Sequence, residues 1–240
     1  MTVTQNRKER QRLERETLIL EQAARLLTRD GFQDLNLDEL AMAVEYSKGT
    51  LYLHFKTKED LVLAVATHVL KHRADLLEKA AGFAGTGRER ARAMGFACCE
   101  FAVAHPEFFT LELMLQARSF WNRVSDARRD QHLAETRRLC RIVRQLVCEA
   151  RQAGELPRVT SADDVTLSLM AITMGSHSAI TLPQLRALFE IKNPLAILLM
   201  HQDRMLDGWG WKPLSGGSRH TALDRRIHKE LFPTAAWFKP

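Results

Sequence analysis

The chain has 240 residues, 45% of them hydrophobic and 27% charged, and its formal net charge is +6. This composition is typical of globular proteins, excludes a fibrous or disordered chain, and permits a polyanionic partner without requiring one. Thr2 to Glu16 lack the apolar core of a signal peptide, and the four cysteines have no C-x-x-C spacing, so we expect a cytoplasmic protein.

Long segments of helical periodicity, with few glycines and prolines, predict an all-α fold. The first helix is expected from about residue 10 to residue 30, with Leu13 and Leu27 on its inward face. Gly31 follows this helix and favours a left-handed helix end. Residues 1–12 carry a net positive charge, which fits either an arm that contacts DNA phosphates or a solvated helix start.

Two short helices joined by a tight turn are predicted between residues 36 and 56. Asn36 and Ser47 are helix-capping residues, and an apolar pattern of helical spacing follows each of them. The apolar positions are Leu37, Leu40, Ala41, Val44, Leu51 and Phe55. Thr57 then caps a longer helix that extends to about residue 79. Such a pair of short helices is typical of proteins that place the second helix in the DNA major groove.

The outward face of the second short helix is small and polar. It consists of Lys48, Gly49, Thr50, Tyr52 and His54. The first turn of such a helix can reach base edges and phosphates, and Lys58 at the start of the next helix suits a phosphate oxygen. The sequence therefore predicts contacts with double-stranded DNA.

The run YSKGTLYLHFKTKEDL at residues 46–61 closely resembles the signature of TetR-type one-component transcriptional regulators. The resemblance covers roughly the first 75 residues. It implies a three-helix N-terminal helix-turn-helix domain and a larger C-terminal helical domain for ligand binding and dimerisation. The predicted DNA-binding residues are Asn36, Ser47, Lys48, Gly49, Thr50, Tyr52, His54 and Lys58. The resemblance places Lys48 and Thr50 nearest the bases, and Tyr52 and Lys58 on phosphate.

One position departs from the family pattern. Glu45 stands in the turn where the family usually has glycine. Either the turn follows a different path, or Glu45 accepts a positive φ at a cost of roughly 1 kcal/mol. The negative charge of Glu45 also lies near the expected DNA side.

We expect a DNA-binding domain over residues 10–60, inside a family-type domain of about 14–74 and with the reading unit at about 37–56. An effector-binding and dimerisation domain is expected over 61–209, and a C-terminal extension over 210–240. Further helices are predicted at about 88–104, 106–115, 125–153, 161–182, 194–207 and 222–231.

The helices at 161–182 and 194–207 resemble in position the pair by which TetR-type chains form homodimers. An intramolecular core is the alternative. The first of these helices has an uncharged stretch of membrane-span length, but Thr, Ser and His side chains interrupt it, so no membrane contact is expected. Trp211 and Trp237 predict that the C-terminal extension packs against the rest of the chain.

The resemblance also implies a small-molecule effector that enters the second domain, moves the helix at 57–79 and changes the separation of two DNA-reading helices. The candidate pocket residues favour a hydrophobic effector, although the same pattern fits a plain core. They are Phe101, Phe108, Met114, Trp121, Met170, Met174 and His177. The predicted function is a ligand-responsive repressor. The alternatives are a DNA-binding dimer without an effector and a helical enzyme.

Other reactive side chains give no comparable pattern. His68, His72 and Asp75 have a spacing that can supply metal ligands, but the sequence offers no fourth ligand and a solvated helix face explains them, so no metal or cofactor is predicted. Cys98 and Cys99 fit either a thiol sensor or small core residues. No Ser-His-Asp order or phosphate-binding loop stands out, so no catalytic residue is predicted.

Overall fold

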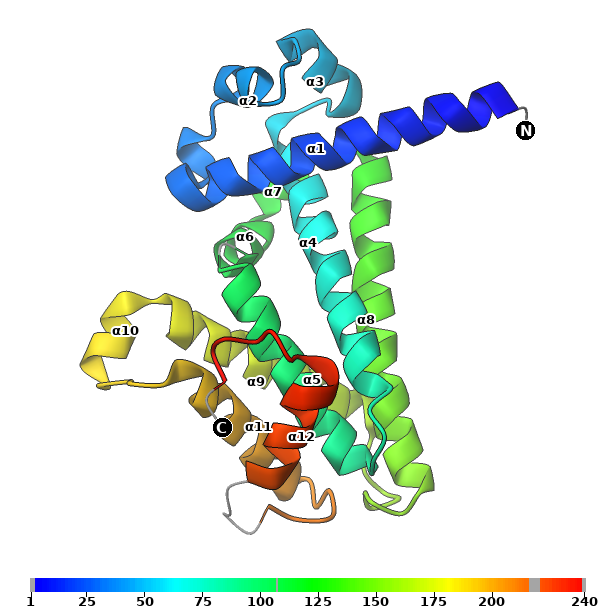
Figure 1. Cartoon of the computed structure of the whole chain (residues 1–240), viewed down its shortest axis with the longest axis vertical. Helices are drawn as coiled ribbons and strands as arrows, with labels where there is room; N and C mark the ends of the chain where they lie inside the picture. Colours follow the sequence, from blue (N-terminus) through cyan, green and yellow to red (C-terminus); the bar gives the residue numbers. More distant parts are fainter. Residues whose placement is uncertain (1–2, 107, 216–220, 239–240) are drawn as a thin grey trace. The chain divides into compact units, whose positions relative to one another are not determined.

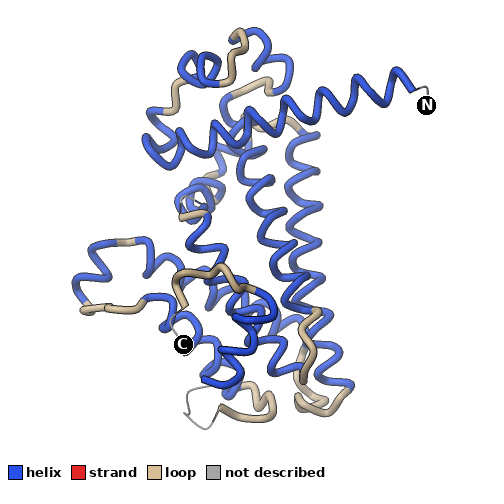
Figure 2. Tube along the Cα trace, viewed as in Figure 1, coloured by secondary structure: helices blue, strands red, loops and turns tan. Residues whose placement is uncertain are grey.

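The structure is a computed structural model that describes residues 3–106, 108–215 and 221–238 (Figure 1). All regular elements in these ranges are helices, joined by loops and turns (Figure 2), so the predicted all-α fold is confirmed. In chain order the helices are α1 (Val3–Asp34), α2 (Leu37–Ala43), α3 (Lys48–His54), α4 (Lys58–Ala81), α5 (Gly87–Ala104), α6 (Phe108–Leu115), α7 (Arg118–Trp121), α8 (Asp126–Gln152), α9 (Ala162–Thr181), α10 (Pro183–Leu188), α11 (Pro194–Gly208) and α12 (Thr221–Leu231).

The chain forms two compact units. Unit 1 contains residues 1–70 and 110–134, and unit 2 contains residues 71–109 and 135–240. The long helices α4 and α8 each contribute residues to both units. These units are defined by compactness. The predicted boundaries between the DNA-binding domain, the effector-binding domain and the C-terminal extension, near residues 60 and 209, stay predictions.

Unit 1 has its core where α1, α2, α3 and the first turns of α4 meet. Ile19, Leu40, Leu51 and Leu61, one from each of these helices, are buried. The inward face predicted for the first helix is wrong at Leu13, which is 53% exposed. Gly31 has a φ of 77° and interrupts α1, as its position at the expected helix end predicted.

Unit 2 is organised around α5, which is buried along most of its length. Helix α11 packs against both α5 and α9, and α12 packs against α5 (Figure 1). Thr86 and Glu89 cap α5 reciprocally: the Thr86 hydroxyl accepts from the Glu89 N–H, and the Glu89 carboxylate accepts from the Thr86 N–H. The two short helices α7 and α10 were not expected, because residues 118–121 and 183–188 lie between the predicted helices.

The C-terminal extension packs against unit 2, as predicted from its tryptophans. Trp211 is fully buried, and the Trp237 ring lies 5.2 Å from the Phe96 ring while its N–H donates to the Glu100 carboxylate at 2.7 Å. Arg92 of α5 forms a two-bond pair with the carboxylate of Asp224 on α12, at 2.9 and 2.8 Å. The extension is therefore part of the structure of unit 2.

Candidate functional site

The two short helices of unit 1 are built by their capping residues. The Asn36 side chain accepts a 2.8 Å hydrogen bond from the N–H of Asp38, and the Ser47 hydroxyl accepts one of 3.1 Å from the N–H of Thr50. Both caps agree with the sequence prediction. Each satisfies a backbone donor that the first turn of a helix leaves open.

The turn between α2 and α3 contains a residue with left-handed backbone geometry. Glu45 has a φ of 57°, and the next residue, Tyr46, donates its N–H to the carbonyl of Ala41 at 2.9 Å. Of the two alternatives for this turn, the structure thus has the second, in which a non-glycine residue accepts a positive φ. The strain of this position remains in the folded protein.

Helix α3 presents a small, polar, exposed face, which we call the α3 strip: Ser47, Lys48, Gly49 and Tyr52. The side chain of Tyr52 is 48% exposed. The Lys48 ammonium group donates to the Asp38 carboxylate at 2.9 Å, and this carboxylate raises the pKa of Lys48. A Cβ atom at position 49 would have only the Ser47 hydroxyl within 4 Å, at 3.6 Å. The helix surface at Gly49 is therefore open to solvent.

The remaining predicted DNA contacts are less accessible. Thr50 is half-buried, with its hydroxyl 2.9 Å from that of Ser47. Only 7% of the His54 side chain is exposed, and its Nδ1 lies 3.5 Å from the Glu16 carboxylate, so it does not belong to the α3 strip. Lys58 is half-buried, with its ammonium group 4.9 Å from the centre of the Phe32 ring. A direct contact of His54 with DNA would require its side chain to leave Glu16.

Sequence reasoning missed the residues that brace α3. Arg128 donates to the carboxylate of Glu16 at 2.7 Å and to the carbonyl of His54 at 3.1 Å. Asp38, the partner of Lys48, lies in the first turn of α2. None of these pairs has a local sequence signature, because the partners lie between ten and 112 residues apart.

Unit 2 contains a small cavity of about 40 Å³. Four of its lining residues are polar or weakly polar: Arg73, Cys98, Thr173 and Gln202. The others are apolar: Leu77, Ala91, Met94, Gly95, Leu139, Val143, Leu146, Leu169 and Met170. The volume holds about two to four water molecules, because one water needs roughly 10–15 Å³ by this measure.

Most of the predicted pocket residues do not line this cavity. Met170 does. Phe101 and Phe108 are buried against each other with ring centres 5.1 Å apart. Met114 and Trp121 belong to unit 1, and the indole N–H of Trp121 donates to the carbonyl of Leu115 at 2.5 Å.

The other two predicted pocket residues, Met174 and His177, also lie outside the lining. Met174 is half-buried, and His177 is fully buried with its Nε2 donating to the carbonyl of Cys98 at 3.2 Å. Burial, together with the charge of Arg73, lowers the pKa of His177 to about 3. This imidazole is therefore neutral at physiological pH.

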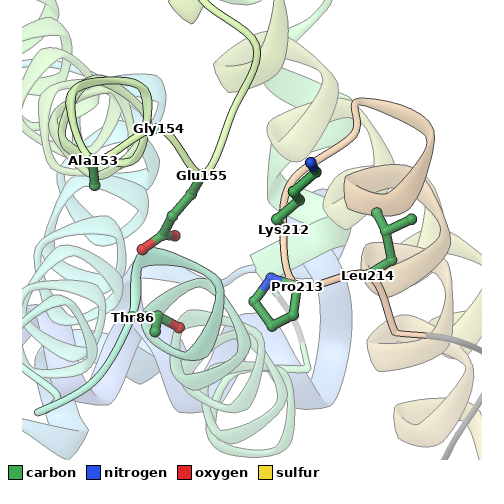
Figure 3. Close-up of a pocket in the computed structure, with 7 residues that line it drawn as sticks. All are labelled: Thr86, Ala153, Gly154, Glu155, Lys212, Pro213 and Leu214. Atoms are coloured by element: carbon green, nitrogen blue, oxygen red, sulfur yellow. The ribbon is translucent and has the colours of Figure 1, made fainter.

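A second hollow of about 450 Å³ lies open on the surface of unit 2 (Figure 3). Glu155 forms part of its wall, and the carboxylate accepts hydrogen bonds from the N–H groups of Gly87 and Arg88 at 2.9 and 3.0 Å. It also accepts one from the indole N–H of Trp211 at 3.1 Å. These bonds cap α5 and hold the segment after α11, so we assign the acidic residue of this hollow a structural role.

The structure favours the core interpretation for the cysteine pair. Cys98 and Cys99 are buried and unpaired by disulfides, and burial raises the pKa of both thiols. Raised thiol pKa values disfavour the reactive thiolate. Within the described ranges, no group of three or more His, Cys, Asp or Glu side chains could hold a metal ion, and no helix is long and apolar enough to cross a membrane.

Two short capped helices, joined by a left-handed turn and packed against a longer helix, define a helix-turn-helix protein of all-α class. Residues 19–65 match the family model described as bacterial regulatory proteins, tetR family. The matched residues contain the whole of α2 and α3, so the similarity to this family lies in the helix-turn-helix part of the chain.

A curated relative and several solved structures resemble the chain. Over 93 residues it is 31% identical to the uncharacterized HTH-type transcriptional regulator YhgD of Bacillus subtilis (strain 168). The match covers 39% of this chain and 49% of the relative, so the chain spans about half the length of the curated relative it matches.

The similar solved structures cover most of both chains. The transcriptional regulator FadR from Bacillus subtilis, in complex with stearoyl-CoA, has a TM-score of 0.64 at 14% identity and covers 80% of this chain and 98% of its own. PfmR from Thermus thermophilus has a TM-score of 0.59 at 22% identity, covering 84% and 99%. A regulator from Saccharomonospora viridis in complex with choline has a TM-score of 0.62 at 18% identity, covering 81% and 96%. At these identities the likeness concerns the fold.

Proposed function

We propose that the chain is a sequence-specific DNA-binding regulator that represses a promoter in the cytoplasm by occupying an operator. The observation that supports this most directly is the α3 strip, a small polar face presented by a seven-residue capped helix. A short helix of this kind enters the major groove, where its first turn contacts base edges and phosphates. In this role Lys48 and Thr50 read bases, while Tyr52 holds phosphate.

The regulator acts as a homodimer through the faces of α9 and α11. These helices leave apolar and small residues exposed, among them Leu167 at 66% and Met200 at 41%, together with Ala171 and Gly175. An apolar patch of this kind is typical of an interface between identical chains. Two copies of α3 at a separation of roughly 34–36 Å would match half-sites one helical turn of DNA apart.

A small effector binds in the cavity of unit 2 and weakens operator binding. Residues of α4, α5, α8, α9 and α11 line this cavity. Because α4 continues from these residues to the capped turn at Lys58, a shift of α4 is the step by which effector binding changes the separation of the two α3 helices. Two of the similar structures hold a small molecule, which supports a ligand site in this fold.

Operator binding tests the proposal directly. Lys48→Ala and Tyr52→Phe should weaken binding to DNA from the chain's own upstream promoter region, by about tenfold or more for Lys48→Ala, in fluorescence anisotropy titrations at fixed salt. Arg141→Ala removes the same charge from an exposed position of unit 2 and should retain wild-type affinity. All three variants should remain dimeric by analytical ultracentrifugation. A monomeric protein, or equal affinities for all variants, would contradict the proposal.

A second candidate function is a DNA-binding dimer without an effector. The observation that favours it is the size of the cavity, about 40 Å³, which is far below the roughly 300–1,000 Å³ of drug-sized ligand sites. The two functions differ in one measurement. A screen in which no small molecule changes operator affinity, while operator binding itself is intact, would favour the dimer without an effector.

A further inference from the structure

An exposed leucine stands on the helix proposed to read DNA. Leu53 of α3 is 84% exposed, whereas Leu51, two residues earlier, is 3% exposed and belongs to the core of unit 1. Leu53 therefore contributes little to the fold, because the contribution of an apolar side chain depends on the surface that folding removes from water. A single exposed leucine is common on protein surfaces, so its position on α3 decides what it does.

Leu53 and Gly49 occupy the outermost positions of α3. Each residue turns an α-helix by about 100°, so both positions lie about 160° from the buried Leu51 and about 40° from each other. Tyr52 and Thr50 lie about 100° from Leu51, on opposite flanks of the helix. Because Leu51 faces the core, Gly49 and Leu53 form the side of α3 that enters a DNA groove first.

The neighbours of Leu53 leave the centre of this side to it. Gly49 has no side chain, and its surface is open to solvent, so the backbone of the first turn can approach base edges closely. Thr50 is half-buried on one flank, with its hydroxyl 2.9 Å from that of Ser47. One helical turn after Gly49, Leu53 is therefore the side chain that fills the groove.

Thymine is the base that presents an apolar group in the major groove. Guanine, cytosine and adenine present hydrogen-bonding groups there, whereas thymine presents its C5-methyl group beside one acceptor. A leucine against a polar base edge would displace water without replacing its hydrogen bonds, which costs free energy. Against a methyl group, the same leucine buries apolar surface on both partners.

We propose that Leu53 selects thymine at one position of each operator half-site by packing against its C5-methyl group. This assignment rests on the proposed DNA-binding function and adds a specificity-determining residue to it. The DNA contacts predicted from the sequence are glycine and polar side chains, and Leu53 is not among them. Its role becomes visible only from its exposure and its angular position on α3.

DNA without thymine methyl groups tests this contact. The chain's own upstream promoter fragment is amplified once with dTTP and once with dUTP, because uracil keeps the hydrogen-bonding groups of thymine but lacks the methyl group. Fluorescence anisotropy at one salt concentration compares the two affinities. The wild-type dimer should bind the uracil fragment about tenfold more weakly, because each methyl contact is worth roughly three- to fourfold and the dimer makes two. Equal affinities would overturn the proposal.

Variants assign the preference to Leu53. Leu53→Ala should bind the two fragments within about twofold of each other and should bind the uracil fragment as the wild type does, which also verifies its fold. Leu53→Met has a similar volume and should keep most of the preference. Thr50→Ser removes the methyl group of Thr50 and should keep the preference too. Leu214→Ala changes an exposed leucine of unit 2 and should behave as wild type. A preference that survives in Leu53→Ala would overturn the assignment.

Single replacements locate the contact on the DNA. Uracil in place of one thymine at a time should weaken wild-type binding at one position in each half-site. An effect spread evenly over the fragment would indicate altered DNA shape and would overturn the proposal. Failure here is distinct from failure of the regulator. Equal binding of both fragments rejects only the thymine contact, whereas absent binding of the wild-type chain to the thymine fragment rejects the proposed DNA-binding function.

Discussion

Arg128 at the beginning of α8 donates a 2.7 Å hydrogen bond to the carboxylate of Glu16 on α1, and both side chains are largely buried. The same guanidinium donates to the carbonyl of His54, the last residue of α3, and lies 4.9 Å from the centre of the Phe55 ring. Helix α8 is therefore bonded directly to the end of the helix proposed to read DNA. Farther along, α8 supplies Leu139 and two other residues to the lining of the cavity in unit 2. This gives the proposed regulator a second connecting helix besides α4.

Replacing Arg128 with methionine should destabilise the protein. The substitution leaves the partly buried Glu16 carboxylate without its main donor, which costs about 1–3 kcal/mol of unfolding free energy, measured by urea denaturation at neutral pH. The operator affinity should also fall, because α3 loses its bond to α8. Arg144→Met removes a solvent-exposed pair with Asp163 and should leave the unfolding free energy close to that of the wild type.

The effect of Arg128→Met should depend on pH. Burial raises the pKa of Glu16, but hydrogen bonds and charges from Arg128 and His54 outweigh it, so the pKa lies below its usual value. The unfolded chain therefore binds a proton at higher pH than the folded one. The stability contributed by Arg128 is complete above the ordinary glutamate pKa of about 4.3 and declines as pH falls through the lower folded pKa. A pH-independent difference between the two proteins would argue against this pair.

His177 should make the protein sensitive to mild acid. The folded chain keeps this imidazole neutral down to a pKa of about 3, whereas the unfolded chain protonates near pH 6.5. The stability that the neutral His177 contributes is fully present above pH 6.5. It is lost progressively as pH falls below 6.5, because the unfolded state then binds a proton at this histidine and the folded state does not. Between pH 7 and pH 5 the wild type should lose about 2 kcal/mol more unfolding free energy than His177→Gln. Parallel pH curves for the two proteins would show that His177 titrates normally.

Glycine at position 45 should stabilise the turn between α2 and α3. Glu45 has a φ of 57°, a conformation that glycine adopts without a steric cost, so Glu45→Gly should raise the unfolding free energy by roughly 1 kcal/mol. Glu45→Ala removes the same charge but keeps the strain, and should give no such gain. Thermal and urea unfolding of the pair separates backbone strain from charge. Equal gains in both variants would point to the charge.

Asp224→Asn should loosen the C-terminal extension. The substitution removes one of the two carboxylates that face the buried Arg92. Asp203 remains at 2.6 Å, so the loss of unfolding free energy should stay below the roughly 3–5 kcal/mol that leaving a buried charge without a partner costs. Limited proteolysis should then cut the chain after residue 211 faster than in the wild type. Asp163→Asn disrupts only an exposed pair and serves as the control. Equal cleavage rates in both variants would mean that other contacts hold the extension.

Local signals predicted much of the fold. Asn36 and Ser47 cap their helices and Gly31 interrupts α1 as expected, because each of these features depends on residues only a few positions apart. Of the two alternatives that the sequence left open for the turn at Glu45, the structure has the one with a positive φ. Short helices such as α7 lacked a clear apolar repeat, so the sequence did not separate them from loops.

The cavity could not be predicted in the same way. Apolar spacing marks the inward face of a helix but does not distinguish a packed position from one beside a void, so it does not separate Phe101 and Phe108, whose rings pack against each other, from residues that line the cavity. The two polar residues that give the cavity its chemistry, Arg73 and Gln202, occupy helical positions without a motif. Both line the cavity because α4 and α11 each contribute to it, and this arrangement has no counterpart in the local sequence.

The pairing of Arg92 with Asp224 also bears on how the chain folds as it is synthesised. Arg92 precedes both carboxylates that pair with it, Asp203 and Asp224, by more than a hundred residues, and Phe96 precedes Trp237, whose ring lies against it, by still more. Unit 2 therefore cannot complete its interior while translation is still in progress over those residues. Until α11 and α12 have been synthesised, the apolar residues of α5 that they cover are exposed to solvent.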